Sequence, residues 1–205
     1  MSDKCKRKTK LFFTISLLLS VLIVSILVLL CNAGTWLLIS DSVPERLDLV
    51  FTFAGENVRD AYSRELLQKF PYAHWLMSDY KEGYSRILRR ESYDMTRVSI
   101  VDTCSNTLSE VTTLCKWINK SNRMLANNKD SVLYVGLVSG PYHMRRIKMM
   151  IDKKYPQQRV RFFFLPVPLE RYNWTDDMFK KWWRSPVSES VSSEIKKIAY
   201  FLLVS

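Results

Sequence analysis

The sequence predicts an α/β fold: a Rossmann-like, mostly parallel five-stranded sheet with helices on both faces, preceded by one transmembrane helix. Five short apolar segments alternate with helical segments of about 10 to 15 residues, an order typical of parallel sheets covered on both faces. A long uncharged segment comes before them. Hydrophobic residues make up 47% of the chain and only 5 residues are glycine, which excludes a disordered or fibrous protein.

The N-terminal segment predicts a membrane anchor. Residues 1–10 carry five basic side chains and one acidic one, and residues 11–31 carry no charge. At about 1.5 Å per residue, a helix over 11–31 spans roughly 30 Å, the thickness of a bilayer's hydrocarbon core. Basic residues stay on the cytoplasmic side, so we expect a single-pass protein of the cell (inner) membrane with a cytoplasmic tail and an extracytoplasmic domain. A cleaved signal peptide is the alternative, although its apolar region is typically only about 7 to 15 residues long.

A linker over residues 32–46 and one domain over 47–205 follow the anchor, because the remaining length suits a single core. Segments that are apolar, rich in β-formers and bounded by turn residues predict the five strands. These strands are expected at residues 47–53, 72–77, 95–101, 131–138 and 159–165.

The segments between the strands predict helices. They cover residues 58–70, which Pro71 closes; the basic segment 80–90; residues 106–119; and residues 141–154, which Pro141 opens. The last forty residues break the alternation. An aromatic segment with Trp174, Phe179, Trp182 and Trp183 precedes a final amphipathic helix, and we interpret both as a cap packed on the domain rather than a second domain.

The basic character of the chain bears on its partners. The formal net charge is +11, and the tail, with five basic residues against Asp3, supplies +4 and leaves +7. Behind a membrane anchor, this excess suits anionic lipid headgroups or an anionic envelope ligand rather than nucleic acid. An ordinary solvated basic surface explains it equally well. The predicted partners are therefore the lipid bilayer, through residues 11–31, and an anionic ligand, with no nucleic acid.

Polar and turn-forming residues gather after the predicted strands, where open α/β sheets bind ligands. The candidate ligand-binding residues are Gly55, Arg59, Asp79, Asn106, Thr107, Ser139, Gly140 and Tyr142, and the candidate catalytic residues are His143, Arg146 and Asp102. His143 and Arg146 share a helical face, and together they offer a proton-transferring group beside a fixed cation. The alternatives are helix capping by Asn106 or Thr107, and a capping or core role for His143 with Arg146 solvated.

Other chemistry is less well supported by the sequence. The chain has two histidines, His74 and His143, and no Cys and His cluster at metal-ligand spacing, so we expect no metal site. His74, inside an apolar strand, is expected to be structural. No G-x-G-x-x-G motif follows the first strand, which disfavours a dinucleotide-dependent enzyme, and the residues identify no cofactor. No disulfide is expected between Cys104 and Cys115, because a helix between them would hold them too far apart.

Three elements resemble the ElyC/SanA/YdcF family, an envelope-associated domain of unknown function. They are the glycine turn and Arg59 after the first strand, the Asn106-Thr107 pair, and above all residues 138–146 (VSGPYHMRR). The similarity covers roughly residues 48–168. It departs in the first turn, where the family is richer in glycine, and after the second strand, where Ser78-Asp79-Tyr80 stands in place of a Ser-Gly-Gly turn.

The resemblance implies a Rossmann-like, commonly membrane-anchored domain that serves envelope and peptidoglycan integrity. For cytoplasmic relatives, an S-adenosylmethionine-like or nucleotide ligand has been suggested, but no reaction is implied. The leading hypothesis is an envelope-maintenance protein that binds an anionic or glycan-lipid (peptidoglycan-precursor-like) ligand at the strand ends, with hydrolase or transferase activity as an open question. The alternative is a non-catalytic protein that docks on a membrane partner through its aromatic C-terminal segment.

Overall fold

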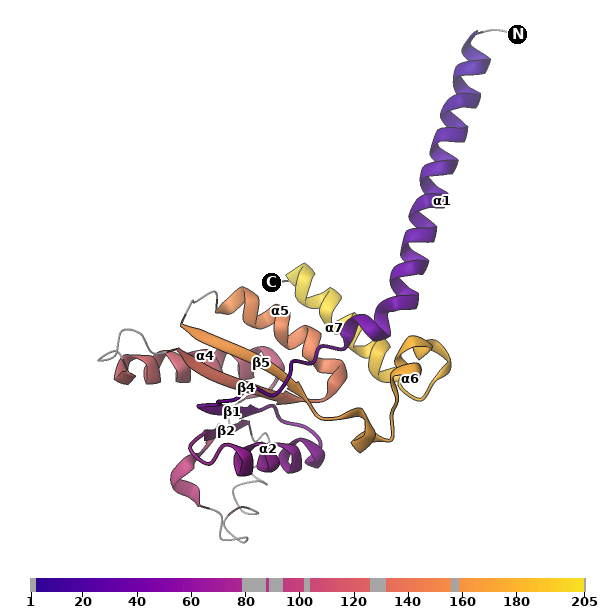
Figure 1. The fold of residues 1–205 in the computed structure, drawn as a ribbon. Coiled ribbons are helices and arrows are strands. Elements are labelled where there is room, and N and C mark those ends of the chain that lie inside the picture. The colour runs from indigo at the N-terminus through magenta and orange to yellow at the C-terminus, as the bar shows by residue number, and fades with distance from the viewer. Residues whose placement is uncertain are drawn as a thin grey trace.

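Five parallel strands form one sheet in the order β3-β2-β1-β4-β5 (Figure 1). The strands are β1 (Leu49–Thr52), β2 (His74–Ser78), β3 (Val98–Val101), β4 (Leu133–Ser139) and β5 (Val160–Pro166). The computed structural model describes residues 3–78, 88, 94–101, 104–125, 132–155 and 159–204. All five strands lie within the segments predicted for them or within one residue of their ends. The Rossmann-like parallel sheet is confirmed.

Helices cover both faces of the sheet, as predicted. On one face, α2 (Asn57–Lys69) packs Leu66 and Leu67 against Val50 and Trp75 of the sheet. On the other face, α4 (Thr107–Leu125) and α5 (Met144–Lys154) form a larger core with the opposite side chains of the same strands. Side chains alternate between the faces of a strand, so β1 and β4, with a helix layer on each side, are almost wholly apolar.

Several element boundaries differ from the prediction. The segment from Pro141 begins as a 3-10 turn, η2 (Pro141–His143), before α5, and β3 is preceded by a second 3-10 turn, η1 (Met95–Arg97). Helix α4 continues past residue 119 to Leu125. The helix predicted over 80–90 lies outside the described residues except for Leu88, which is helical and buried.

The C-terminal residues form a third core together with the end of the N-terminal helix. They comprise η3 (Leu169–Tyr172), α6 (Asp176–Lys180), η4 (Trp182–Arg184) and α7 (Ser188–Val204). Their buried side chains surround Leu37 and Tyr142. The members of this core are Leu37, Tyr142, Phe179, Val187, Val191 and Ile198.

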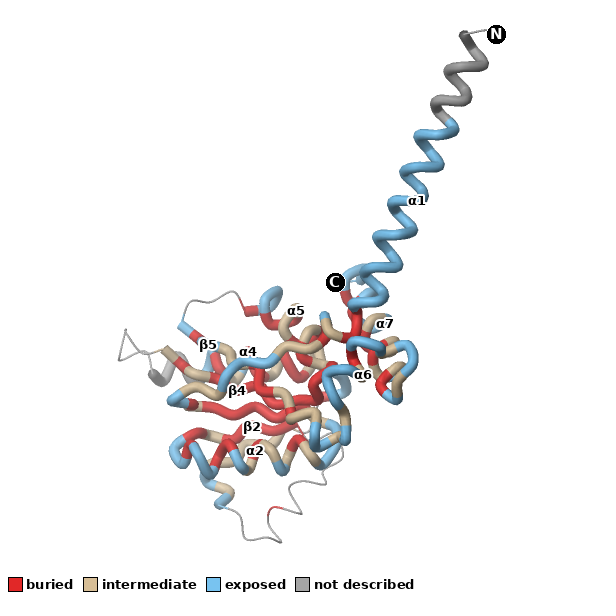
Figure 2. Tube along the Cα trace, turned by 45° about the vertical axis from the view of Figure 1, so that its right-hand side comes forward, coloured by how far each residue is buried: buried red, intermediate tan, exposed pale blue. Residues whose placement is uncertain are grey.

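Helix α1 (Asp3–Leu37) contains a segment, Phe12–Leu37, that is long and apolar enough to cross a membrane. It projects from the domain and is exposed until it reaches the third core (Figure 2). The expected linker over 32–46 begins instead as the last turns of this helix, in which Ala33 and Leu37 are buried. A Cβ atom at Gly34 would collide with the carbonyl oxygen of Phe179, so the helix docks with its backbone directly against α6.

Two side-chain hydrogen bonds to the backbone of α1 and a pair of hydrogen bonds between Asp41 and strand β5 complete this docking. The Trp182 indole donates to the carbonyl oxygen of Leu30 at 2.9 Å, and Arg145 Nε donates to that of Trp36 at 2.7 Å. Further along, Asp41 exchanges two hydrogen bonds with the backbone of Phe164 on the edge strand β5, each 2.8 Å long. The segment between anchor and sheet is therefore held on the domain, because its polar and apolar groups find partners there.

Candidate functional site

The candidate site lies where the strand order reverses, between β1 and β4. The chain leaves β1 toward α2 on one face and leaves β4 toward α5 on the other, so the two loops separate at this point. Such a switch point is where open α/β sheets bind ligands. Gly55 and Gly140 occupy the two loops.

The guanidinium group of Arg59 fills the space between these two loops. Its Nη1 donates to the carbonyl oxygen of Ala54 at 2.6 Å. Gly55 has φ +153°, and a Cβ atom there would lie 2.6 Å from the Arg59 guanidinium carbon; a Cβ at Gly140 would lie 3.2 Å from Nη2. Both loops therefore approach Arg59 closely because glycine stands in each. Arg59 Nε is buried and makes no hydrogen bond to any described residue.

The Glu56 carboxylate occupies a cradle of three donors. Arg59 Nη2 lies 2.8 Å from Oε2, the Tyr142 hydroxyl donates to Oε1 at 2.9 Å, and the Tyr172 hydroxyl donates to Oε2 at 3.3 Å. Burial raises the pKa of Glu56, but Arg59 and the Tyr142 hydrogen bond outweigh it, and the pKa is lowered overall. The Glu56 side chain remains 44% exposed, so it can leave the cradle without unfolding the domain.

The two tyrosines are held as donors by their surroundings. Burial and the neighbouring Glu56 carboxylate raise the pKa of Tyr142, and the same causes raise that of Tyr172 to about 12. Trp174 stacks on Tyr172 with a centroid separation of 4.7 Å and contacts Tyr142 at 5.5 Å. Both hydroxyls therefore stay protonated near pH 7 and point at the same carboxylate.

A second cluster adjoins the cradle at the start of α5. His143 Nδ1 lies 3.0 Å from Oε1 of Glu194, a residue of α7, and Arg146 Nε donates to Oε2 of the same carboxylate at 2.7 Å. Lys197 adds a third contact at 2.9 Å. Burial raises the pKa of Glu194, but the contacts with His143 and Arg146 outweigh this effect and lower the pKa to about 2. Glu194 is thus an ionised, fully buried carboxylate that joins α5 to α7.

The contacts of His143 determine its tautomer. An ionised carboxylate cannot donate, so Nδ1 carries the hydrogen and donates to Glu194, and the Arg146 contact at 3.3 Å is secondary. Burial lowers the pKa of His143 more strongly than Glu194 raises it, so the ring is neutral near pH 7. Nε2 then holds a lone pair, and no described residue hydrogen-bonds to it. A Cβ at Gly140 would lie 3.3 Å from the His143 ring, which places this ring beside the Arg59 cradle.

The buried Glu110 fixes the loop after β1. Its Oε1 accepts a hydrogen bond from the Ala54 amide at 2.8 Å, and burial raises its pKa while this bond and nearby charges partly offset the increase. Glu110 comes from the first turn of α4, so this helix supports the site through the loop.

The structure groups most of the predicted site residues. Seven of them surround the switch point: Gly55, Arg59, Ser139, Gly140, Tyr142, His143 and Arg146. The Ser139 hydroxyl is buried there and has no hydrogen-bond partner among the described residues. Two of these residues are already paired: Arg59, a predicted ligand-binding residue, holds Glu56, and Arg146, predicted as the fixed cation beside His143, holds Glu194.

The remaining predicted residues lie elsewhere or outside the described part. Asn106 caps α4: its Oδ1 accepts from the Ser109 amide at 2.9 Å, and Thr107 begins the helix. This is the capping alternative. Asp79 and Asp102 lie outside the described residues. His74 bonds Ser99 of the neighbouring strand at 2.9 Å and stacks on Trp117, as a structural residue does.

Sequence reasoning missed Glu194 and Tyr172. Glu194 stands in the apolar stripe of α7 beside Val191, Ile195 and Ile198, and a carboxylate in such a stripe signals a buried partner. Tyr172 lies in a loop with no periodic pattern, so the sequence holds no comparable signal for it. Trp182, part of the segment interpreted as a cap packed on the domain, packs against the third core and bonds α1.

Metal and thiol chemistry find little support in the described part of the chain. No three His, Cys, Asp or Glu side chains gather there closely enough to hold a metal ion. Cys104 and Cys115 are both free and buried. The donor groups of the site, a guanidinium and two phenols, are instead those that bind an anion.

Together, the fold and the site define a Rossmann-like α/β protein with one N-terminal helix suited to a membrane. Comparison of the chain with models of protein families, with curated proteins and with solved structures finds no match.

Proposed function

We propose that this protein is a membrane-anchored envelope-maintenance protein of the ElyC/SanA/YdcF type, which binds the anionic group of a lipid-linked ligand between β1 and β4. His143 serves as the proton acceptor for hydrolase or transferase chemistry on that ligand. The observation that carries the proposal is the cradle of Arg59, Tyr142 and Tyr172, which already holds the carboxylate of Glu56.

The cradle supports an anionic ligand because its occupant is a partly exposed side chain. A phosphate or carboxylate that displaced Glu56 would meet the same guanidinium and two hydroxyls, and the N-terminus of α2 directly behind them. The buried Arg59 Nε is a further donor, with no hydrogen-bond partner among the described residues. Glu56 thus acts as a placeholder that keeps Arg59 paired while no ligand is bound.

The His143–Glu194 pair supports proton transfer. A carboxylate that accepts from Nδ1 orients the imidazole and stabilises the imidazolium that forms when Nε2 takes a proton. Arg146 holds the other oxygen of Glu194 and so fixes the carboxylate. A water or hydroxyl nucleophile hydrogen-bonded to Nε2 would lose its proton there.

The anchor supports a lipid-linked rather than a freely diffusing ligand. Helix α1 is long and apolar enough to cross a bilayer, and its last turns are part of the third core that also contains Tyr142. The basic tail favours a cytoplasmic N-terminus, which would leave the domain on the outer side of the membrane. The resemblance over residues 48–168 favours an envelope role.

Calorimetry with inorganic pyrophosphate on the full chain in detergent micelles tests the cradle. We expect Arg59→Gln to weaken binding at least about tenfold, because a charge-assisted pair contributes about 1.5 to 3 kcal/mol. Arg46→Gln is the matched control, since Arg46 is an exposed arginine paired with Asp48 at the other end of β1. Equal affinities of the two variants would reject the assignment.

A further inference from the structure

The last turn of α7 is apolar on every side, whereas a helix end surrounded by water usually carries polar side chains on its exposed face. Tyr200, Leu202, Leu203 and Val204 are 68%, 63%, 86% and 66% exposed, and only Phe201 turns into the core. Among the described residues outside α1, only two other large hydrophobic side chains are exposed, those of Tyr72 and Trp183. The exposed apolar surface of the domain is therefore concentrated at this turn.

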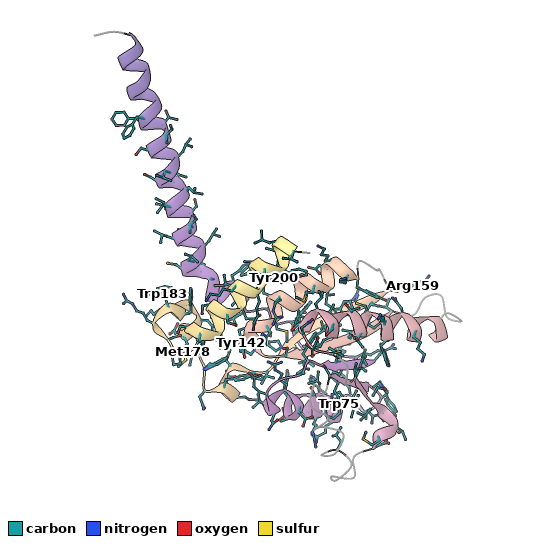
Figure 3. The ribbon with its side chains drawn as sticks, turned by 180° about the vertical axis from the view of Figure 1, so that it is seen from behind. Trp75, Tyr142, Arg159, Met178, Trp183 and Tyr200 are labelled. Atoms are coloured by element: carbon teal, nitrogen blue, oxygen red, sulfur yellow. The ribbon has the colours of Figure 1, made fainter. Side chains whose placement is uncertain are left out.

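This turn lies on the side of the domain from which α1 projects. Figure 1 shows the C-terminal end of α7 on the same side of the domain as the point where α1 leaves it. Figure 3 shows Tyr200 on this side, and Trp183 near the base of α1. On α1 itself, the exposed residues continue from Phe12 to Asn32, and Ala33 is buried. A bilayer spanned by α1 therefore has its surface near the level of Tyr200.

The docking of α1 fixes this arrangement. The backbone contact between Gly34 and Phe179 and the hydrogen bond from Trp182 to Leu30 join α1 to the domain on one side. On the other side, Arg145 bonds the Trp36 carbonyl and lies over the Trp36 ring, 5.0 Å from its centroid. The domain cannot swing freely about α1, so the last turn of α7 keeps its place relative to the bilayer.

The residues around the apolar turn suit a lipid headgroup region. Lys196 and Lys197 are exposed one turn earlier on α7, and the Lys153 ammonium lies over the ring of Phe201. Aromatic and basic side chains around an apolar tip are typical of the membrane interface, where basic groups contact anionic phosphates.

We infer that the last turn of α7, residues 200–204, inserts into the interfacial region of the same bilayer that α1 spans. The inference rests on the proposed membrane anchoring. It adds a second membrane contact to the domain, and that contact holds the helix that carries Glu194, the partner of His143. The contact thereby fixes where the site lies relative to the membrane surface.

Fluorescent labelling in proteoliposomes tests this contact. The full chain, with Cys5 and Cys31 replaced by serine, receives one environment-sensitive label at Leu203→Cys, at Val24→Cys or at Tyr72→Cys. Val24 lies within the apolar part of α1, and Tyr72 is 97% exposed at the loop before β2. The vesicles contain phosphatidylcholine and phosphatidylglycerol with brominated acyl chains, and aqueous iodide serves as the opposing quencher.

We expect the brominated lipid to quench the label at residue 203 severalfold more than the label at residue 72, and iodide to do the reverse. Equal behaviour of the two labels, with residue 24 still quenched by lipid, overturns this inference and leaves the anchor intact. A label at 203 that neither quencher reaches also overturns it, because a second copy of the chain would then cover the turn. Loss of lipid quenching at residue 24 overturns the anchor itself.

Discussion

His143 and Glu194 are joined through Nδ1 and Oε1 at 3.0 Å, although they come from opposite ends of the C-terminal half of the domain. The bond fixes which nitrogen of the imidazole carries the hydrogen. It also gives the final helix a role in the site, which the helix's amphipathic pattern alone does not indicate. The proposed chemistry at Nε2 depends on this one contact.

The tautomer of His143 can be measured directly. We expect ¹⁵N NMR of the imidazole near pH 7 to show a neutral ring protonated at Nδ1, because burial lowers its pKa and Glu194 accepts the Nδ1 hydrogen. Glu194→Gln should raise the population protonated at Nε2. His74 is the internal control, because its Nε2 bonds Ser99 and is remote from Glu194. A variant spectrum identical to that of the wild type would show that Glu194 does not set the tautomer.

Glu194 should make stability depend on acid pH. Its folded pKa of about 2 lies below its ordinary value of 4.5, so its contribution is present above about pH 4.5 and is lost as the pH falls toward 2. Removing one partner of a buried ion pair costs about 3 to 5 kcal/mol, so Glu194→Gln should be less stable by about that amount at pH 7. The difference should shrink as the pH approaches 2.

Denaturant unfolding at a series of pH values measures this difference. Glu189→Gln, an exposed position in the same helix, is the control and should follow the wild type throughout. A wild-type advantage over Glu194→Gln that stayed constant down to pH 2 would contradict the account.

The close approach at Gly34 predicts that α1 and the domain separate when a side chain is added there. A Cβ atom would meet backbone rather than a flexible side chain, so Gly34→Val should destabilise the docking by about 1 to 3 kcal/mol or more. Limited trypsin digestion at the exposed Arg46 should then become faster. Leu29→Ile, on the exposed face of α1, should leave digestion unchanged. Unchanged digestion of Gly34→Val would mean that α1 is not held as described.

Gly55→Ala should disturb the site through Arg59. The backbone at φ +153° disfavours any side chain, and the new methyl group would collide with the guanidinium. We expect a loss of about 1 to 2 kcal/mol of stability and weaker pyrophosphate binding than in the wild type. Calorimetry and thermal unfolding measure the two effects, and unaltered binding would show that Arg59 keeps its place or does not contact the anion.

The sheet could be predicted from the sequence because its strands carry strong local signals. Residues 133–139, for example, are a short apolar run with turn residues on both sides, and burial of β4 between two helix layers requires that composition. The end of α1 could not be placed, because its docking depends on a single glycine meeting a backbone carbonyl 145 positions later. Hydrophobic periodicity contains no information about such a contact.

The candidate site was predictable only in its location. The rule that ligands bind at strand ends brought Gly55, Arg59, Gly140 and His143 together correctly. The carboxylates that pair with the cations were not found, since the partner of Arg146 lies on α7 and the role of Glu56 depends on the rotamer of its side chain. The Arg146–Glu194 pair joins α5 to α7 and is a tertiary property, whereas Glu56 and Arg59 are only three residues apart in the sequence.

The most direct test of the central claim compares pyrophosphate binding by the wild type with that by Glu56→Ala. If Glu56 is a placeholder in an anion site, its removal frees Arg59, Tyr142 and Tyr172, so calorimetry should show tighter binding even though the variant is less stable. Arg59→Gln should show the opposite change. Glu56→Ala binding no tighter than wild type would mean that the pair is only structural, and would contradict the proposed function.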